Sequence, residues 1–196
     1  MREKSRRGDG HILEQQLIDA ATKLLVESQG FQPPSLRAVA RECGVSPSAI
    51  YLHFSSQAEL TRRVVVEQFD ALRRALVQTD DPSQTADQRL TALGTAYTRW
   101  AVENEGAYQL LFDTPDVDPP AGVTWAPGLD LLGLPIQLFE ELGNDEQQAT
   151  RLATTLWSSW HGLISLRRNS PAAPWTHSLE DDASYLASKL IGDKPI

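Results

Sequence analysis

The chain has 196 residues, of which 41% are hydrophobic, so it is globular rather than disordered and long enough for one or two domains. The net charge is −8, but the first 78 residues carry 11 Lys and Arg against 9 Asp and Glu, whereas the remaining residues carry 7 against 17. The acidic second half is therefore excluded as a nucleic-acid surface, because phosphates would repel it.

Three further features bound the class of protein. No apolar run approaches membrane-spanning length, and the basic N-terminus is not followed by the apolar segment of a secretory signal. A single cysteine permits no internal disulfide, which fits a reducing compartment. We therefore expect a cytoplasmic protein that crosses no membrane.

The chain begins with a basic arm, which is followed by a predicted helix. Residues 1–10 contain Arg2, Lys4, Arg6 and Arg7. Such an arm can contact DNA or remain a solvated tail, and the composition does not separate the two. Apolar residues then recur at helical spacing from Ile12 to Ser28, which predicts an amphipathic helix.

The stretch from Ser35 to Leu60 predicts a helix-turn-helix. Ser35 is a good N-cap, and Gly44 suits the left-handed position that ends a helix. Ser46 is a second predicted N-cap, with Pro47 at the first helical position, where the missing N–H costs nothing. Ile50 can then pack back on Val39 and Val45 of the motif's first part. Two short helices, a glycine turn and an apolar contact make up the motif.

The spacing of Gly44-Val45-Ser46, Ile50-Tyr51, His53-Phe54, Ser56 and Leu60 resembles the signature of the TetR (tetracycline-repressor-like) transcriptional regulators. The resemblance covers about residues 11–66. It implies an all-α fold with an N-terminal three-helix DNA-binding domain, which we place at residues 9–68. A long helix, predicted from about Gln57 to Gln78, would connect this domain to the remainder.

The resemblance and the local pattern assign nine residues to DNA contact. Ser35, Ser46, Tyr51 and His53 match family positions that hold phosphates, and Arg37, Pro47, Ser48 and Ala49 are candidates for reading bases or DNA shape. The ninth is Gln57, where the family usually has a lysine, so one phosphate-binding cation is missing.

The second half predicts a C-terminal helical bundle for ligand binding and dimerisation, which we place at residues 83–192. Helical spacing of apolar residues predicts five helices, at residues 85–104, 106–112, 131–142, 144–168 and 178–191. Asn144 is the predicted N-cap of the fourth, and Ser178 and Asp181 resemble a capping box at the start of the fifth. The proline-rich stretch 114–127 predicts a loop, and no strand pattern occurs.

Aromatic residues of the second half are candidates for an effector pocket. Trp160-His161-Gly162 resembles an element of one TetR-type C-terminal class. Each aromatic side chain alone is more typical of a core, but as a set they suit a cavity between helices. The predicted ligand-binding residues are Tyr97, Trp100, Tyr108, Phe112, Trp157 and His161. The acidic charge of this half disfavours a strongly anionic effector, so we expect an apolar or aromatic one.

Two leucine-rich stripes predict either a subunit interface or packing within the chain. Helices 144–168 and 178–191 could form a four-helix interface with a second copy. The residues concerned are Leu152, Leu156, Leu163, Leu179, Ala183, Leu186 and Leu190.

The sequence offers little for catalysis or metal binding. The four histidines lack partners at metal-ligand spacing, no phosphate-binding glycine loop is present, and Ser158 with His161 lacks an acid partner. We expect no cofactor, no metal and no enzymatic activity. The favoured function is a homodimeric repressor that a small molecule releases from a palindromic operator. The alternatives are a ligand-independent activator or architectural DNA-binding protein, and an all-α small-molecule-binding or enzymatic bundle.

Overall fold

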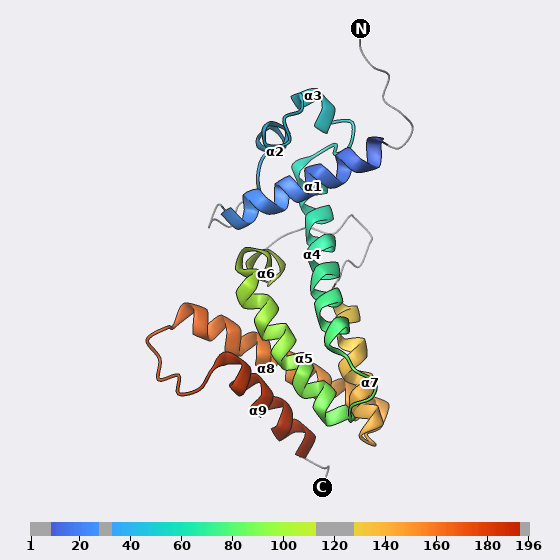
Figure 1. The fold of residues 1–196 in the computed structure, drawn as a ribbon, viewed down its shortest axis with the longest axis vertical. Helices are drawn as coiled ribbons and strands as arrows, with labels where there is room; N and C mark the ends of the chain where they lie inside the picture. Colours follow the sequence, from blue (N-terminus) through green and yellow to red (C-terminus); the bar gives the residue numbers. More distant parts are fainter. Residues whose placement is uncertain (1–8, 28–32, 113–127, 193–196) are drawn as a thin grey trace. The chain divides into compact units, whose positions relative to one another are not determined.

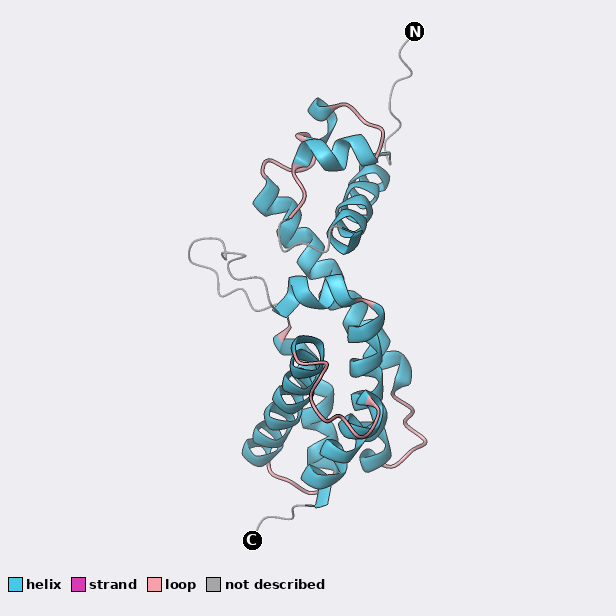
Figure 2. Cartoon of the chain, turned by 90° about the vertical axis from the view of Figure 1, so that its left-hand side faces the viewer, coloured by secondary structure: helices cyan, strands magenta, loops and turns pink. Residues whose placement is uncertain are grey.

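The computed structural model describes residues 9–27, 33–112 and 128–192, and every regular element in these ranges is a helix (Figure 2). The all-α expectation is therefore confirmed. The predicted basic arm (Arg2, Lys4, Arg6, Arg7) and most of the predicted loop 114–127 lie outside the described residues. The described chain forms two compact units, one of residues 9–69 and 104–112, the other of residues 70–103 and 128–192.

The first unit is a small helical domain, whose helices Figure 1 shows, and it is built around an apolar core. It contains α1 (Asp9–Glu27), α2 (Leu36–Glu42), α3 (Pro47–Ile50), the first part of α4 (Gln57–Thr79) and α6 (Glu105–Phe112). The apolar positions that recur at helical spacing are the ones that point inward. The buried residues include Leu17, Ile18 and Ala21 of α1, Leu36, Val39 and Ala40 of α2, and Ile50, Phe54, Leu60 and Val64.

Helix α6 belongs to the first unit although α5 precedes it in the chain. It packs against α1, and Tyr108 on α6 is fully buried. The Phe112 ring meets the Phe69 ring edge-on at 5.8 Å between centroids and lies 4.9 Å from the Tyr108 ring. These aromatic contacts attach α6 to the first part of α4.

The start of α4 is fixed by a reciprocal set of capping bonds. The Glu59 N–H donates to Ser56 Oγ at 3.2 Å, and the Glu59 carboxylate accepts from the Ser55 N–H at 2.7 Å and the Ser55 hydroxyl at 2.6 Å. These hydrogen bonds to Ser55 lower the pKa of Glu59 below its ordinary value. The predicted start of this helix is confirmed.

The second unit packs five helical segments together. They are the end of α4, α5 (Ala86–Glu103), the 3-10 helix η1 (Leu129–Leu132) with α7 (Gly133–Glu141), α8 (Glu146–Asn169) and α9 (Leu179–Gly192). Figure 1 shows α5, α8 and α9 side by side, with α7 against α8. The predicted helix 131–142 is divided, because its first turn belongs to η1 and α7 begins at Gly133.

Two helix starts in this unit test the predicted capping residues. The Asp181 N–H donates to Ser178 Oγ at 3.0 Å, which confirms the capping pair before α9. The predicted cap of α8 is wrong by one residue: Asp145, not Asn144, accepts from the Gln148 N–H, at 2.8 Å. The Asn144 amide instead donates to the Phe139 carbonyl, which closes the preceding turn.

Trp160 forms the junction between α5, α8 and α9. Its indole N–H donates to the Ala183 carbonyl on α9 at 3.0 Å, and its ring stacks on Tyr97 of α5 at 6.1 Å between centroids. A Cβ placed on Gly94 of α5 would lie 2.7 Å from Cζ2 of Trp160. The close approach of α5 to α8 therefore requires glycine at this position.

We expect Gly94→Ala to lower the free energy of unfolding by about 1–3 kcal/mol, because the added methyl group overpacks the indole of Trp160. Urea unfolding followed by circular dichroism would measure the change. Gly133→Ala is the matched control, because a Cβ there meets nothing within 4 Å, and it should stay within about 0.5 kcal/mol of the parent. Equal effects of the two changes would contradict the assignment.

Candidate functional site

Helices α2 and α3 form the predicted helix-turn-helix. Ser35 Oγ accepts from the Ala38 N–H at 3.2 Å and caps α2, and Gly44 has φ +67°, so glycine suits the turn. Helix α3 starts at Pro47 and buries Ile50 completely. Ser46 occupies the cap position without capping, since its hydroxyl lies 2.9 Å from the Ser48 hydroxyl instead.

The residues predicted to contact DNA lie together in this motif. Seven of the nine are exposed: Ser35, Arg37, Ser46, Pro47, Ser48, Tyr51 and Gln57; Ala49 and His53 are half-buried. Ile50 and Phe54 of the same motif are buried, and they anchor the short recognition segment in the core of the first unit. The local fold thus presents a polar surface with few long side chains.

Two residues beside this surface were missed by the sequence analysis. Arg41 lies one helical turn after Arg37 on α2, both are exposed, and no carboxylate in the described ranges pairs with either guanidinium. Leu52, directly after Tyr51, is 85% exposed. Arg41 could have been predicted from its spacing, because residues at i and i+4 share a helix face and Arg41 is four residues after Arg37.

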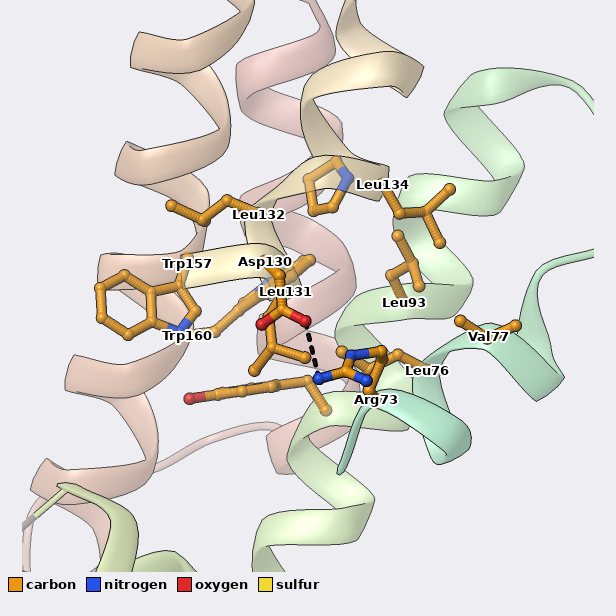
Figure 3. A pocket seen from close by; sticks show the side chains of 12 residues that line it. Arg73, Leu76, Val77, Leu93, Asp130, Leu131, Leu132, Leu134, Trp157 and Trp160 are labelled. Atoms are coloured by element: carbon orange, nitrogen blue, oxygen red, sulfur yellow. Dashed lines mark ion pairs between the residues drawn. The ribbon is translucent and has the colours of Figure 1, made fainter. Parts of the chain in front are cut away.

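An apolar cavity of about 120 Å³ lies within the second unit (Figure 3). Its walls come from the end of α4, from α5, from η1 with the start of α7, and from α8. The lining residues are Arg73, Leu76, Val77, Leu93, Tyr97, Asp130, Leu131, Leu132, Leu134, Pro135, Trp157 and Trp160. A cavity lined mostly by hydrophobic and aromatic groups with a few polar ones is typical of small-molecule sites.

The predicted ligand-binding residues are not all brought to this cavity. Tyr97 and Trp157 line it. Trp100 is buried in the same unit without lining it, and His161 stacks on Trp157 with 6.0 Å between ring centroids. Tyr108 and Phe112 lie in the first unit.

One ion pair forms the charged part of the cavity wall. Arg73 Nη2 lies 2.7 Å from Asp130 Oδ2. The dashed line in Figure 3 marks this ion pair. Arg73 Nη1 lies 2.8 Å from Asp70, one helical turn earlier on α4. Arg73 and Asp130 are 57 residues apart, so no local pattern could have paired them.

The described residues show no metal site and no membrane-spanning helix. No group of three or more His, Cys, Asp or Glu side chains in these ranges could hold a metal ion. No helix among them combines the length and the apolar character needed to cross a bilayer.

Comparison with known proteins identifies the family. The family described as "Bacterial regulatory proteins, tetR family" matches residues 17–64, which include the helix-turn-helix. The family described as "Tetracyclin repressor-like, C-terminal domain" matches residues 90–188, half of the chain. The chain belongs to the tetR family.

Curated transcriptional regulators resemble between 32% and 56% of the chain. The HTH-type transcriptional regulator Rv1816 of Mycobacterium tuberculosis is 31% identical over 114 residues, which are 56% of this chain and 47% of that protein. The chain spans about half or less of the length of the curated relatives it matches.

Two solved structures share the fold over nearly the whole chain. A TetR-like transcriptional regulator from Rhodococcus sp. RHA1 has a TM-score of 0.66 and 18% identity, covering 97% of this chain and 100% of that one. The regulator FadR from Bacillus subtilis, solved in complex with stearoyl-CoA, has a TM-score of 0.63 and 13% identity, covering 91% of this chain and 97% of that one. At these identities the likeness shows the fold alone.

The stripes predicted to join two copies of the tetR-family chain divide into two groups. Leu152, Leu156 and Ala183 are buried within the chain itself. These three residues therefore pack in the core of their own chain, which was the alternative to a subunit interface. Leu163, Leu179, Leu186 and Leu190 are half-exposed and retain surface that a second copy could cover.

Gln57 is the position at which this chain departs from the tetR-family pattern, which usually has a lysine there. Its amide donates to the Pro33 carbonyl at 2.6 Å, so the side chain bonds within the domain. We expect Gln57→Lys to strengthen binding to every DNA sequence and to increase the slope of log affinity against log salt by about 1, because one more cation displaces counterions from DNA.

Fluorescence anisotropy over a salt series, on the operator and on random DNA, would measure this change. Gln78→Lys adds the same charge at an exposed position near the other end of α4 and should leave the slope unchanged. An unchanged slope for Gln57→Lys would show that this position does not approach the phosphates.

Proposed function

We propose that this tetR-family chain is a sequence-specific transcriptional regulator that binds a palindromic operator as a homodimer and represses transcription until a small molecule releases it. The observation that carries the proposal is the exposed face of the helix-turn-helix, with Arg37 and Arg41 lacking acidic partners among the described residues. Helix α3 would enter the major groove, as the recognition helix of this motif does.

The exposed residues suggest how the operator is read. Ser35, Ser46, Tyr51 and His53 would hold phosphates and fix the register of the domain on DNA. Arg37 can donate two hydrogen bonds to guanine, and the small side chains of Pro47 and Ala49 suit thymine methyl groups. Ser48 would add a single polar contact. With so few long side chains, part of the specificity would come from DNA shape.

The cavity of the second unit supports a response to a ligand. Its walls are largely apolar and aromatic, and FadR with the same fold was solved with stearoyl-CoA. Helix α4 supplies Arg73, Leu76 and Val77 to the cavity and begins at Gln57 in the DNA-binding unit. A ligand that binds better to a form unable to hold DNA would shift the protein toward that form.

The proposed homodimer is supported by membership of the family and by four leucine side chains that remain half-exposed. Leu163 on α8 and Leu179, Leu186 and Leu190 on α9 are the half-exposed residues we assign to the dimer interface. The proposed location is the cytoplasm, and no catalytic role is assigned. A ligand-independent activator or architectural DNA-binding protein is the alternative; it would use the same DNA surface without the response to small molecules.

The test is operator binding by the full chain. DNA from the promoter of its own gene should bind at least about 1,000-fold more tightly than random DNA at physiological salt, as expected of specific binders. A screen of apolar and aromatic molecules for thermal stabilisation should then yield one that releases the operator. Equal affinity for both DNAs would overturn the proposal, whereas specific binding that no ligand changes would favour the alternative.

A further inference from the structure

We propose that the effector is a lipophilic cation, an amine with an apolar ring or branched chain, and that Asp130 is its counter-ion. The inference rests on the proposed function, since it deepens the ligand response of the same cavity. Its basis is the Arg73–Asp130 pair, the charged part of a cavity wall that is otherwise apolar or aromatic (Figure 3).

The two charged groups of this wall, Arg73 and Asp130, differ in their surroundings. Two nitrogens of Arg73 already face carboxylates, Nη1 toward Asp70 and Nη2 toward Asp130. The third, Nε, has no hydrogen-bond partner among the described residues, but it is sealed from solvent. An incoming anion that bonded to a remaining Nη–H of Arg73 would therefore lie beside two carboxylates that repel it.

The Asp130 carboxylate is open to a second donor. Its recorded pair uses Oδ2, and the side chain is 52% exposed. A carboxylate has about four acceptor positions on its two oxygens. An ammonium group can thus pair with Asp130 while Arg73 keeps Asp70.

The local charge balance also favours a cation. Arg73 stands between two carboxylates, so this group of three carries one net negative charge. A cation neutralises it, whereas an anion would double it. Because the side chains are partly exposed, each contribution is modest, and a difference of about fivefold in affinity for each change of charge is expected.

The composition and size of the cavity suit a small ligand with one aromatic ring and a cationic group. The rings of Tyr97, Trp157 and Trp160 line it, and aromatic faces attract cations. A cavity of about 120 Å³ is close to the roughly 150 Å³ that holds one benzene molecule. The ligand would place one ring or short branched chain inside and its ammonium group beside Asp130.

The experiment compares three probes on the full chain by isothermal titration calorimetry: 2-phenylethylamine, propylbenzene and 3-phenylpropionate, which differ only in the group at the end of a phenylethyl chain. The amine should bind most tightly and the carboxylate least. In Asp130→Asn the amine should lose about fivefold in affinity, and the carboxylate should not lose any. Glu140→Gln removes one exposed negative charge from the same unit outside the cavity lining, and it should keep the parent's order.

Two results would overturn the inference: tighter binding of 3-phenylpropionate than of the amine, or an amine preference that survives Asp130→Asn. Absence of binding by all three probes would also overturn it. Operator binding is measured separately on the same protein without probes, so loss of the cation preference is distinguishable from failure of the proposed DNA-binding function.

Discussion

Leu156→Glu is expected to unfold the second unit rather than to separate two folded subunits. Leu156 is fully buried within the chain, so a glutamate there would place an unpaired charge in the core of α8. Such a charge is among the few changes that cost about 4 kcal/mol or more. Circular dichroism and urea unfolding would show the loss of cooperative structure.

Leu163→Glu is the matched control, since it makes the same change on the same helix at a half-exposed position. This variant should remain folded and run as a monomer in light scattering if Leu163 lies in the proposed dimer interface. A folded, dimeric Leu156→Glu protein would contradict the burial argument. A dimeric Leu163→Glu protein would place the interface elsewhere.

Arg37→Ala should reduce operator affinity by about 5- to 150-fold, the effect of losing a contact worth about 1–3 kcal/mol. The expectation follows from an exposed guanidinium on α2 that no described carboxylate neutralises. Fluorescence anisotropy at fixed salt, on the operator and on random DNA, would measure the loss. A loss confined to the operator indicates base reading, and an equal loss on both indicates a phosphate contact.

Arg99→Ala controls for the lost charge, because Arg99 is an exposed arginine on α5 of the second unit. It should leave operator affinity within about twofold of the parent, since exposed positions outside such contacts change energies little. If the two variants lose affinity equally, the effect is one of overall charge and α2 does not contact DNA.

The helices could be predicted from sequence because their signals are local. Ser35, Gly44 and Pro47 each act on neighbouring backbone groups, so their roles need no knowledge of the remaining chain. The one-residue error at the start of α8 has the same origin. Asn144 and Asp145 both favour cap positions, and only the turn that follows Phe139 decides between them.

The cavity could not be predicted in the same way. Helical periodicity shows which face of a helix is apolar, but it does not show what covers that face. Trp100, Tyr108 and Trp157 all lie on apolar helix faces, yet only Trp157 lines the cavity. The pairing of Arg73 with Asp130 depends on η1 lying against α4, which no short-range pattern encodes.

The membership of α6 in the first unit limits how members of such a family can be recombined. A chimaera joined in the turn between α4 and α5 would bring the donor's α6 together with its effector half. The recipient's Phe69 and α1 would then meet a foreign helix in place of Tyr108 and Phe112. A chimaera that transfers the effector half should therefore keep the recipient's own residues 105–112. The transferred sequence then consists of two segments, one on each side of α6.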